Sequence, residues 1–161
     1  MQLYDHVLIT GASGGIGAAL AQHYAAQAER ISLWGRDLQR LEFLAKICAA
    51  TGAETDIVVL DLSNMQESLD AFTRAEARAP IDLLFLNAGV SDMRQPGRVV
   101  ETPDILLETA LVNYAVPTPG SRVSRPSLWL NAVAAISSSP ALSRHGMICL
   151  SRPLIALQKR G

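Results

Sequence analysis

The sequence has few cysteines and no long apolar run, and each shortage excludes a class of protein. Its cysteines, Cys48 and Cys149, are too few for a disulfide framework. The sequence lacks the close set of cysteine and histidine ligands that a zinc site requires, so we expect no bound metal and a reducing compartment. No apolar run has the length that crosses a bilayer, and the first residues lack the features of a signal peptide. We therefore expect a cytoplasmic protein without a membrane partner.

Charge and length exclude further classes. The net charge of −1 gives no reason to expect a nucleic acid as a partner. A chain of 161 residues is long enough to bury one sizeable core but not two. One domain is therefore expected.

Acidic residues are missing from the C-terminal part of the chain. All 15 lie at or before Glu108, whereas the segment from Thr118 onward has basic residues together with eight serines and four prolines. This change in composition predicts a boundary, with residues 1–117 forming the folded unit and residues 118–161 a divergent tail.

Before that boundary, short apolar runs alternate with longer stretches of helical periodicity. The runs at residues 6–9, 31–34, 56–60 and 81–86 read as strands. Strands that alternate with helices are typical of βαβ units and a parallel sheet. The sequence thus predicts an α/β fold.

Side-chain spacing and capping residues place the helices between these strands. Every fourth residue from Ile16 to Tyr24 is apolar, which predicts the buried face of a first helix. Asp37 is the expected N-cap of a second helix, and Ser63 forms a possible capping box with Gln66 at the start of a third.

A fourth helix is expected to begin at Thr102-Pro103, because proline at the first helical position loses no needed N–H. It should run to about Val116, where Pro117 and Pro119 end it. Beyond these prolines only residues 133–136 resemble a strand.

A glycine-rich segment, Thr10-Gly11-Ala12-Ser13-Gly14-Gly15-Ile16-Gly17, follows the first strand and opens the first helix. Glycines there let the backbone approach a pyrophosphate, which the free N–H groups and dipole of a helix N-terminus can hold. The alternative is a tight strand-to-helix turn without a ligand. The missing Gly-Lys-Ser/Thr ending excludes a P-loop.

This segment resembles the Thr-Gly-x-x-x-Gly-x-Gly pattern of the short-chain dehydrogenase/reductase family. Gly35-Arg36-Asp37, Asp61-Leu62 and Asn87-Ala88-Gly89 follow the next three predicted strands at spacings similar to those of the family. The resemblance implies a Rossmann-like doubly wound parallel sheet with strand order 3-2-1-4, truncated here after about four strands. For an intact relative it also implies a homo-oligomer.

The resemblance further implies a dinucleotide cofactor and the residues that bind it. These are Thr10, Gly11, Ser13, Gly15, Ile16, Gly17, Arg36, Asp61, Leu62, Asn87, Ala88 and Gly89.

Within this set, Arg36 favours NADP over NAD, because a guanidinium can pair with a 2′-phosphate; otherwise it is a solvated surface arginine. Ser13 could add a hydrogen bond to the same phosphate. Asp61 could accept a hydrogen bond from adenine, stabilise a helix N-terminus, or do both. Asn87 is expected to brace the strand ends rather than to do chemistry.

The family's catalytic residues are absent. Members use a serine and a Tyr-x-x-x-Lys pair, whereas the tyrosines here, Tyr4, Tyr24 and Tyr114, have no lysine four residues on. Asn113 matches the asparagine that helps to hold a proton-relay water beside that lysine. Without the lysine, Asn113 reads better as a polar residue in a core helix.

The family reaction is hydride transfer between NADP(H) and a small-molecule carbonyl or alcohol. We expect this chain to be inactive as written, and the alternative is a non-catalytic fragment that binds a dinucleotide or a partner.

A shifted reading frame would account for the missing motif. Taking the last base of each codon with the first two of the next, residues 154–160 permit Tyr-Cys-Ala-Ser-Lys-Ala, which matches the family's catalytic pattern. We therefore expect that residues 118–161 are translated out of frame, through a sequencing error or in a pseudogene. A real, divergent C-terminus is the alternative.

Overall fold

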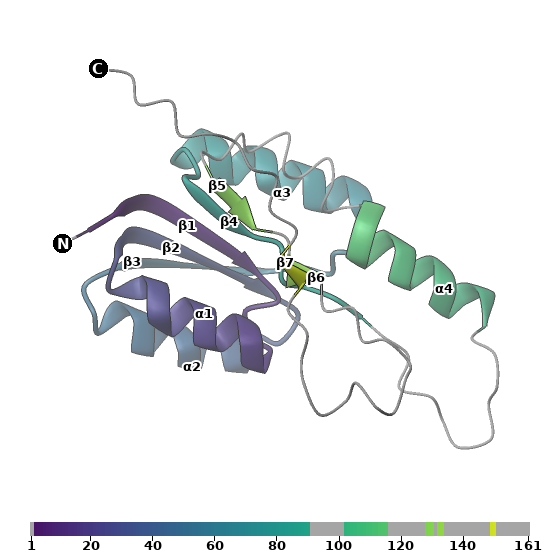
Figure 1. Ribbon diagram of the computed structural model, residues 1–161, viewed down its shortest axis with the longest axis horizontal. Coiled ribbons are helices and arrows are strands. Elements are labelled where there is room, and N and C mark those ends of the chain that lie inside the picture. The colour runs from purple at the N-terminus through teal and green to yellow at the C-terminus, as the bar shows by residue number, and fades with distance from the viewer. Residues whose placement is uncertain (1, 91–101, 116–127, 131, 134–148, 151–161) are drawn as a thin grey trace.

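A computed structural model describes residues 2–90, 102–115, 128–130, 132–133 and 149–150. Its centre is a parallel sheet in the order β3-β2-β1-β4-β5 (Figure 1). The strands of this sheet are β1 (Tyr4–Thr10), β2 (Ala28–Gly35), β3 (Glu54–Val59), β4 (Leu83–Phe85) and β5 (Leu128–Leu130). Two shorter strands, β6 (Ala132–Val133) and β7 (Cys149–Leu150), form an antiparallel pair.

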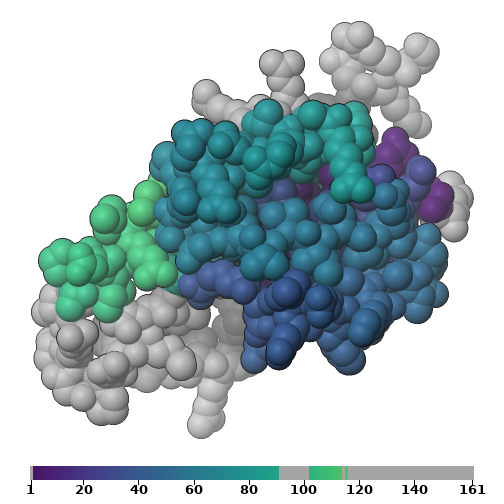
Figure 2. Space-filling view, turned by 180° about the vertical axis from the view of Figure 1, so that it is seen from behind, coloured from purple at the N-terminus to yellow at the C-terminus, as the bar shows by residue number. Residues whose placement is uncertain are grey.

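Helices cover both faces of this sheet. They are α1 (Gly15–Ala25), α2 (Leu38–Ala49), α3 (Met65–Arg78) and α4 (Pro103–Ala110), which continues into the π-helical segment η1 (Leu111–Ala115). Helices α1 and α2 lie on one face and α3 on the other, while α4 lies near the carboxyl ends of the strands (Figure 1). Viewed from behind, α3 spreads over the sheet and α4 projects beyond it (Figure 2).

The predicted doubly wound parallel sheet is confirmed, with its first four strands in the predicted order 3-2-1-4. Beyond these four strands, Leu83–Phe85 of β4 pairs in parallel with Leu128–Leu130 of β5. The strand expected at residues 133–136 is represented by Ala132–Val133. The remainder of that strand lies outside the described residues.

Alternating side chains of the strands build two apolar cores, one on each face. Val7 and Ile9 of β1 face α1 and α2, whereas Leu8 between them faces α3. This alternation follows from the pleat of a strand, and burial on both faces explains why residues 7–9 of β1 are continuously apolar. The core on the α3 face includes Trp34 and Phe72, whose rings lie 4.7 Å apart.

The buried face of α1 differs from the predicted one. Gly17, Ala21 and Ala25 are buried, whereas Ile16 is 54% exposed. Small side chains at these positions let the helix pack closely on the sheet, so the larger apolar residues flank the contact rather than form it. The spacing of large apolar residues therefore placed the face only in part: Leu20 and Tyr24 pack half-buried against the core, whereas Ile16 does not.

The capping predictions are correct at two helices and shifted at a third. The Asp37 carboxylate accepts a hydrogen bond from the Arg40 N–H at 3.1 Å, and α4 begins at Pro103 as expected. At α3, however, the N-cap is Asn64 rather than Ser63. The Ser63 N–H donates to Asp61 Oδ1 at 2.9 Å, which keeps Ser63 inside the preceding turn and moves the cap on by one residue.

A buried histidine connects the sheet to the end of α3. His6 is 1% exposed, with Nδ1 2.9 Å from the Ala79 carbonyl oxygen and Nε2 2.8 Å from Ser32 Oγ. Burial, reinforced by the nearby Arg30 guanidinium, lowers the pKa of His6 below 6.5, although the Ala79 hydrogen bond and the carboxylates of Asp56 and Glu76 oppose this shift.

This burial predicts that the folded protein loses stability in mild acid. The unfolded chain takes up a proton on His6 near pH 6.5, whereas the folded chain resists it until a lower pH. The free energy of unfolding should therefore fall by up to about 1.4 kcal/mol per pH unit below 6.5, until the folded-state pKa is reached. Urea denaturation between pH 8 and pH 5 measures this slope.

His6→Gln should remove this part of the slope and destabilise the protein at pH 8 by about 1–3 kcal/mol, through the lost buried hydrogen bonds. The matched control is His23→Gln, at an exposed position on α1. An unchanged slope in His6→Gln would contradict the assignment.

Candidate functional site

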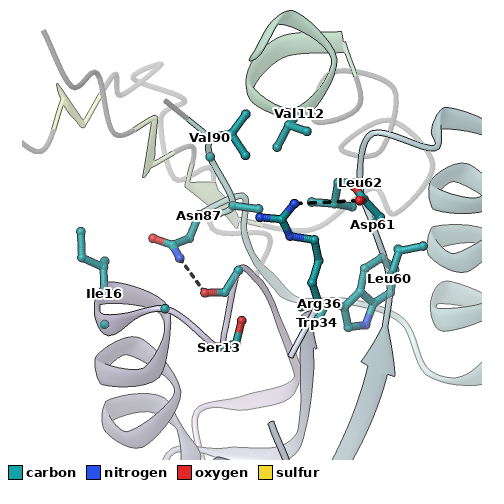
Figure 3. A pocket seen from close by; sticks show the side chains of 16 residues that line it. Ser13, Ile16, Trp34, Arg36, Leu60, Asp61, Leu62, Asn87, Val90 and Val112 are labelled. Atoms are coloured by element: carbon teal, nitrogen blue, oxygen red, sulfur yellow. Dashed lines mark hydrogen bonds and ion pairs between the residues drawn. The ribbon is translucent and has the colours of Figure 1, made fainter. Parts of the chain in front are cut away.

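A cavity of about 350 Å³ opens at the carboxyl ends of the central strands (Figure 3). In doubly wound sheets this is where ligands bind. Its walls come from the loops that follow β1, β2, β3 and β4 and from η1. The lining residues are Gly11, Ser13, Gly14, Gly15, Ile16, Trp34, Gly35, Arg36, Leu60, Asp61, Leu62, Asn87, Ala88, Gly89, Val90 and Val112.

The loop after β1 depends on glycine at two positions. Gly11 has a φ of +67°, and a Cβ there would lie 2.8 Å from Ala88 Cα. A Cβ on Gly17 would overlap the Gly11 carbonyl oxygen and lie 2.8 Å from Asn87 Nδ2. At Gly15, by contrast, a Cβ would meet no atom within 4 Å. The loop is therefore tightly packed on the side of Gly11 and Gly17, and it is open on the side of Gly15.

Thr10 and Asn87 hold this loop against the end of β4. Thr10 Oγ1 donates to the Phe85 carbonyl at 3.3 Å and accepts from the Ala88 N–H at 3.1 Å. Asn87 Nδ2 donates to the carbonyls of Thr10 and Gly11, both at 3.3 Å. Asn87 thus braces the strand ends as predicted.

The N-terminus of α1 faces the cavity with its partial positive charge balanced by no capping side chain and no acidic residue. Its N-cap, Gly14, provides no side-chain hydrogen bond, and the first turn contains no acidic residue. The first N–H groups of a helix have no partner within the helix, and the macrodipole adds partial positive charge there. Gly14, Gly15 and Ile16 line the cavity at this point. The arrangement can hold an anion.

Arg36 lies between two carboxylates on the other side of the cavity. Its Nη1 is 3.9 Å from Asp61 Oδ2 and 3.9 Å from Glu108 Oε1, and its side chain is 61% exposed. The hydrogen bonds from Ser63 lower the pKa of Asp61 below 3.8, with a further contribution from the Arg36 guanidinium. Both charges of the Arg36–Asp61 pair are thus present at neutral pH.

Asn113 fixes the remaining wall. Its Oδ1 accepts from the Val90 N–H at 2.9 Å and its Nδ2 donates to the Val90 carbonyl at 3.0 Å. A Cβ on Gly89 would lie 3.3 Å from Asn113 Oδ1, so this pairing needs a small residue there. Asn113 therefore clamps η1 to the segment that follows β4.

Ten of the twelve predicted cofactor residues line the cavity, and two lie beneath it. Thr10 and Gly17 are buried supports of the loop rather than parts of its surface. Sequence reasoning missed Trp34, Leu60, Val90 and Val112, which line the cavity beside the motif residues. Their positions immediately before or after the motifs were the available signal.

Tyr4 and Tyr24 pack against the core beneath α1 and do not line the cavity. The side chain of Tyr114 lies outside the described residues. Acid/base chemistry by tyrosine thus has no support in the described part of the site.

Comparison with known proteins identifies the class. The profile of the short chain dehydrogenase family matches residues 5–113, which is most of the chain. The chain therefore belongs to the short chain dehydrogenase family.

One curated relative is 3-dehydrosphinganine reductase TSC10A of Arabidopsis thaliana. It is 32% identical over 139 residues, which cover 81% of this chain and 41% of the relative. The chain thus spans about two fifths of that protein's length.

Solved structures share the fold. A 3-oxoacyl (acyl-carrier-protein) reductase from Agrobacterium tumefaciens C58 with NADP bound is 28% identical, with a TM-score of 0.66 over 74% of this chain and 46% of that one. A metagenomic short-chain oxidoreductase in complex with NADP is 29% identical, with a TM-score of 0.68 over 76% of this chain and 56% of that one.

Within the described residues, this chain has no helix that could span a membrane.

The glycine geometry gives a matched pair of variants. Gly17→Ala should lower the free energy of unfolding by about 1–3 kcal/mol, because its methyl group overlaps the Gly11 backbone. Gly15→Ala should leave stability equal or slightly higher, since its methyl group meets no protein atom and alanine favours a helix. Thermal or urea denaturation of the two variants measures the difference. Equal stabilities would show that the loop is looser than its contacts imply.

Proposed function

We propose that this chain binds NADP(H) through residues 1–117, the part that carries the family's nucleotide-binding motifs. The observation that carries the proposal is one cavity with the uncapped N-terminus of α1 on one side and Arg36 on the other. A helix N-terminus suits a pyrophosphate, and a guanidinium suits a 2′-phosphate. The same chemistry fits the family members that have been solved with NADP.

The cavity fits such a ligand. Its volume lies within the range of small-molecule sites, and the space outside Gly15 is free of protein atoms. Gly11, Gly15 and Ile16 would hold the pyrophosphate, and Ser13 with Arg36 would hold the ribose phosphate. Asp61 and Leu62 would receive the adenine, and Asn87-Ala88-Gly89 would lie beside the cofactor. The bound nicotinamide would supply a hydride for a carbonyl or accept one from an alcohol.

Hydride transfer needs residues that this chain lacks. No tyrosine in the sequence is followed by lysine four residues on, so the chain does not carry the pair with which family members give the carbonyl oxygen its proton. We propose that the chain as written binds cofactor without turnover, and that an in-frame version is an oxidoreductase acting on a small carbonyl or alcohol. A non-catalytic fragment that binds a dinucleotide or a partner remains the second proposal.

Two origins of residues 118–161 make different predictions about the gene. An out-of-frame tail accounts for the missing motif and the absence of acidic residues. The match to the Arabidopsis reductase covers 81% of the chain and so extends past residue 118. For the first part of the tail, this favours a divergent C-terminus rather than out-of-frame translation.

Arg36→Ala tests the cofactor proposal. The variant should bind NADPH about tenfold or more weakly, because the phosphate loses a charge-assisted partner, and should bind NADH almost unchanged. Titration of each reduced cofactor, followed by nicotinamide fluorescence, measures both constants. Arg40→Ala, an exposed arginine on α2, is the control. Equal wild-type affinities for the two cofactors would count against NADP.

The chain as written should oxidise no NADPH in the presence of a panel of ketones. Reading the nucleotides that encode residues 118–161, and expressing the alternate frame with its downstream coding sequence, should recover the Tyr-x-x-x-Lys motif and activity. The control is the same long form with that tyrosine changed to phenylalanine. Turnover by the original chain, or a shifted frame without the motif, would refute this account.

A further inference from the structure

The charges around Arg36 do not favour a phosphate as simply as one arginine suggests. Arg36 is the one basic residue among the described residues that line the cavity. Two carboxylates lie 3.9 Å from the same Nη1 atom, so this cluster of three side chains carries a net negative charge. A phosphate arriving at Arg36 would meet one attractive group and two repulsive ones.

The two carboxylates are held differently. Asp61 belongs to the turn before α3, where its Oδ1 accepts the Ser63 N–H at 2.9 Å, and its removal would disturb that turn. Glu108 stands on α4, a helix without buried residues, and Arg36 is its ion-pair partner in the described structure. Its carboxylate joins α4 to the loop after β2. Glu108 can therefore be changed with little effect on the framework of the site.

We propose that Glu108 is a specificity-determining residue that weakens the preference of this site for NADP(H) over NAD(H). This inference rests on the proposed dinucleotide binding. To bind Arg36, a 2′-phosphate would have to break the Arg36–Glu108 ion pair, and its own negative charge would come close to the Glu108 carboxylate. A free 2′-hydroxyl would do neither. The negative charge of Glu108 therefore acts against the phosphorylated cofactor selectively. Its effect passes through Arg36, which makes Glu108 a positioning residue.

Glu108→Gln in the full chain tests this, because it removes the charge and keeps the shape. The variant should bind NADPH about three- to tenfold more tightly at low salt, and NADH within about twofold of wild type. The gain should shrink at high salt, since these side chains are exposed. Glu42→Gln, at an exposed position on α2, removes the same charge away from the cavity and is the matched control.

A double variant shows whether Glu108 acts through Arg36. In the Arg36→Ala background, Glu108→Gln should give a clearly smaller gain for NADPH, because only the direct repulsion remains. Full additivity would overturn the positioning role. Equal gains for both cofactors, or equal effects of Glu108→Gln and Glu42→Gln, would overturn the specificity role. If no variant bound either cofactor, the proposed function itself would fail, and this inference with it.

Discussion

The close approach of the first turn of α1 to the Gly11 carbonyl is the contact on which the site depends. Gly17 allows this approach because any side chain there would collide with the Gly11 backbone, and Asn87 closes it by donating to Gly11 from the end of β4. The contact sets the position of α1 over β1 and leaves its first N–H groups facing the cavity. Gly17 thus both lets α1 pack closely against the loop and leaves the N–H groups at the start of α1 open to the cavity.

The sequence predicted the elements of this fold better than the faces they bury. Short apolar runs are distinctive when a parallel sheet is covered on both sides, so the first four of the five strands were found. The buried face of α1 was predicted only in part, because Gly17, Ala21 and Ala25 are its most buried residues and small residues give a weak periodic signal. Strand β5 was missed because three residues, Leu128–Leu130, are too few to stand out in a serine- and proline-rich segment.

At the candidate site, the motifs identified the residues that approach a ligand through backbone, and missed those that tertiary packing brings to it. Glycine and asparagine at fixed spacing carry their own signal, since few other residues fit those positions. Val112 lines the cavity from η1, and Glu108 approaches Arg36 from α4; the position of these helices depends on the clamp between Asn113 and Val90. No local pattern in the sequence encodes that approach, so the acidic neighbour of Arg36 was not foreseen.

Most of the described packing around the cavity is formed by residues before the tail, whose described contribution to the central sheet is the pairing of β5 with β4. The buried residues of both apolar cores lie between Val7 and Val112, and the hydrogen bonds that hold the cavity walls join residues within the same range. The family's tyrosine, lysine and serine would come from the segment beyond it. A change confined to residues 118–161 would therefore remove the family's catalytic residues while the proposed determinants of cofactor choice, Arg36, Asp61 and Glu108, stay in place. Under the proposed function, cofactor binding and hydride transfer would be separable in this chain because different parts of it would supply them.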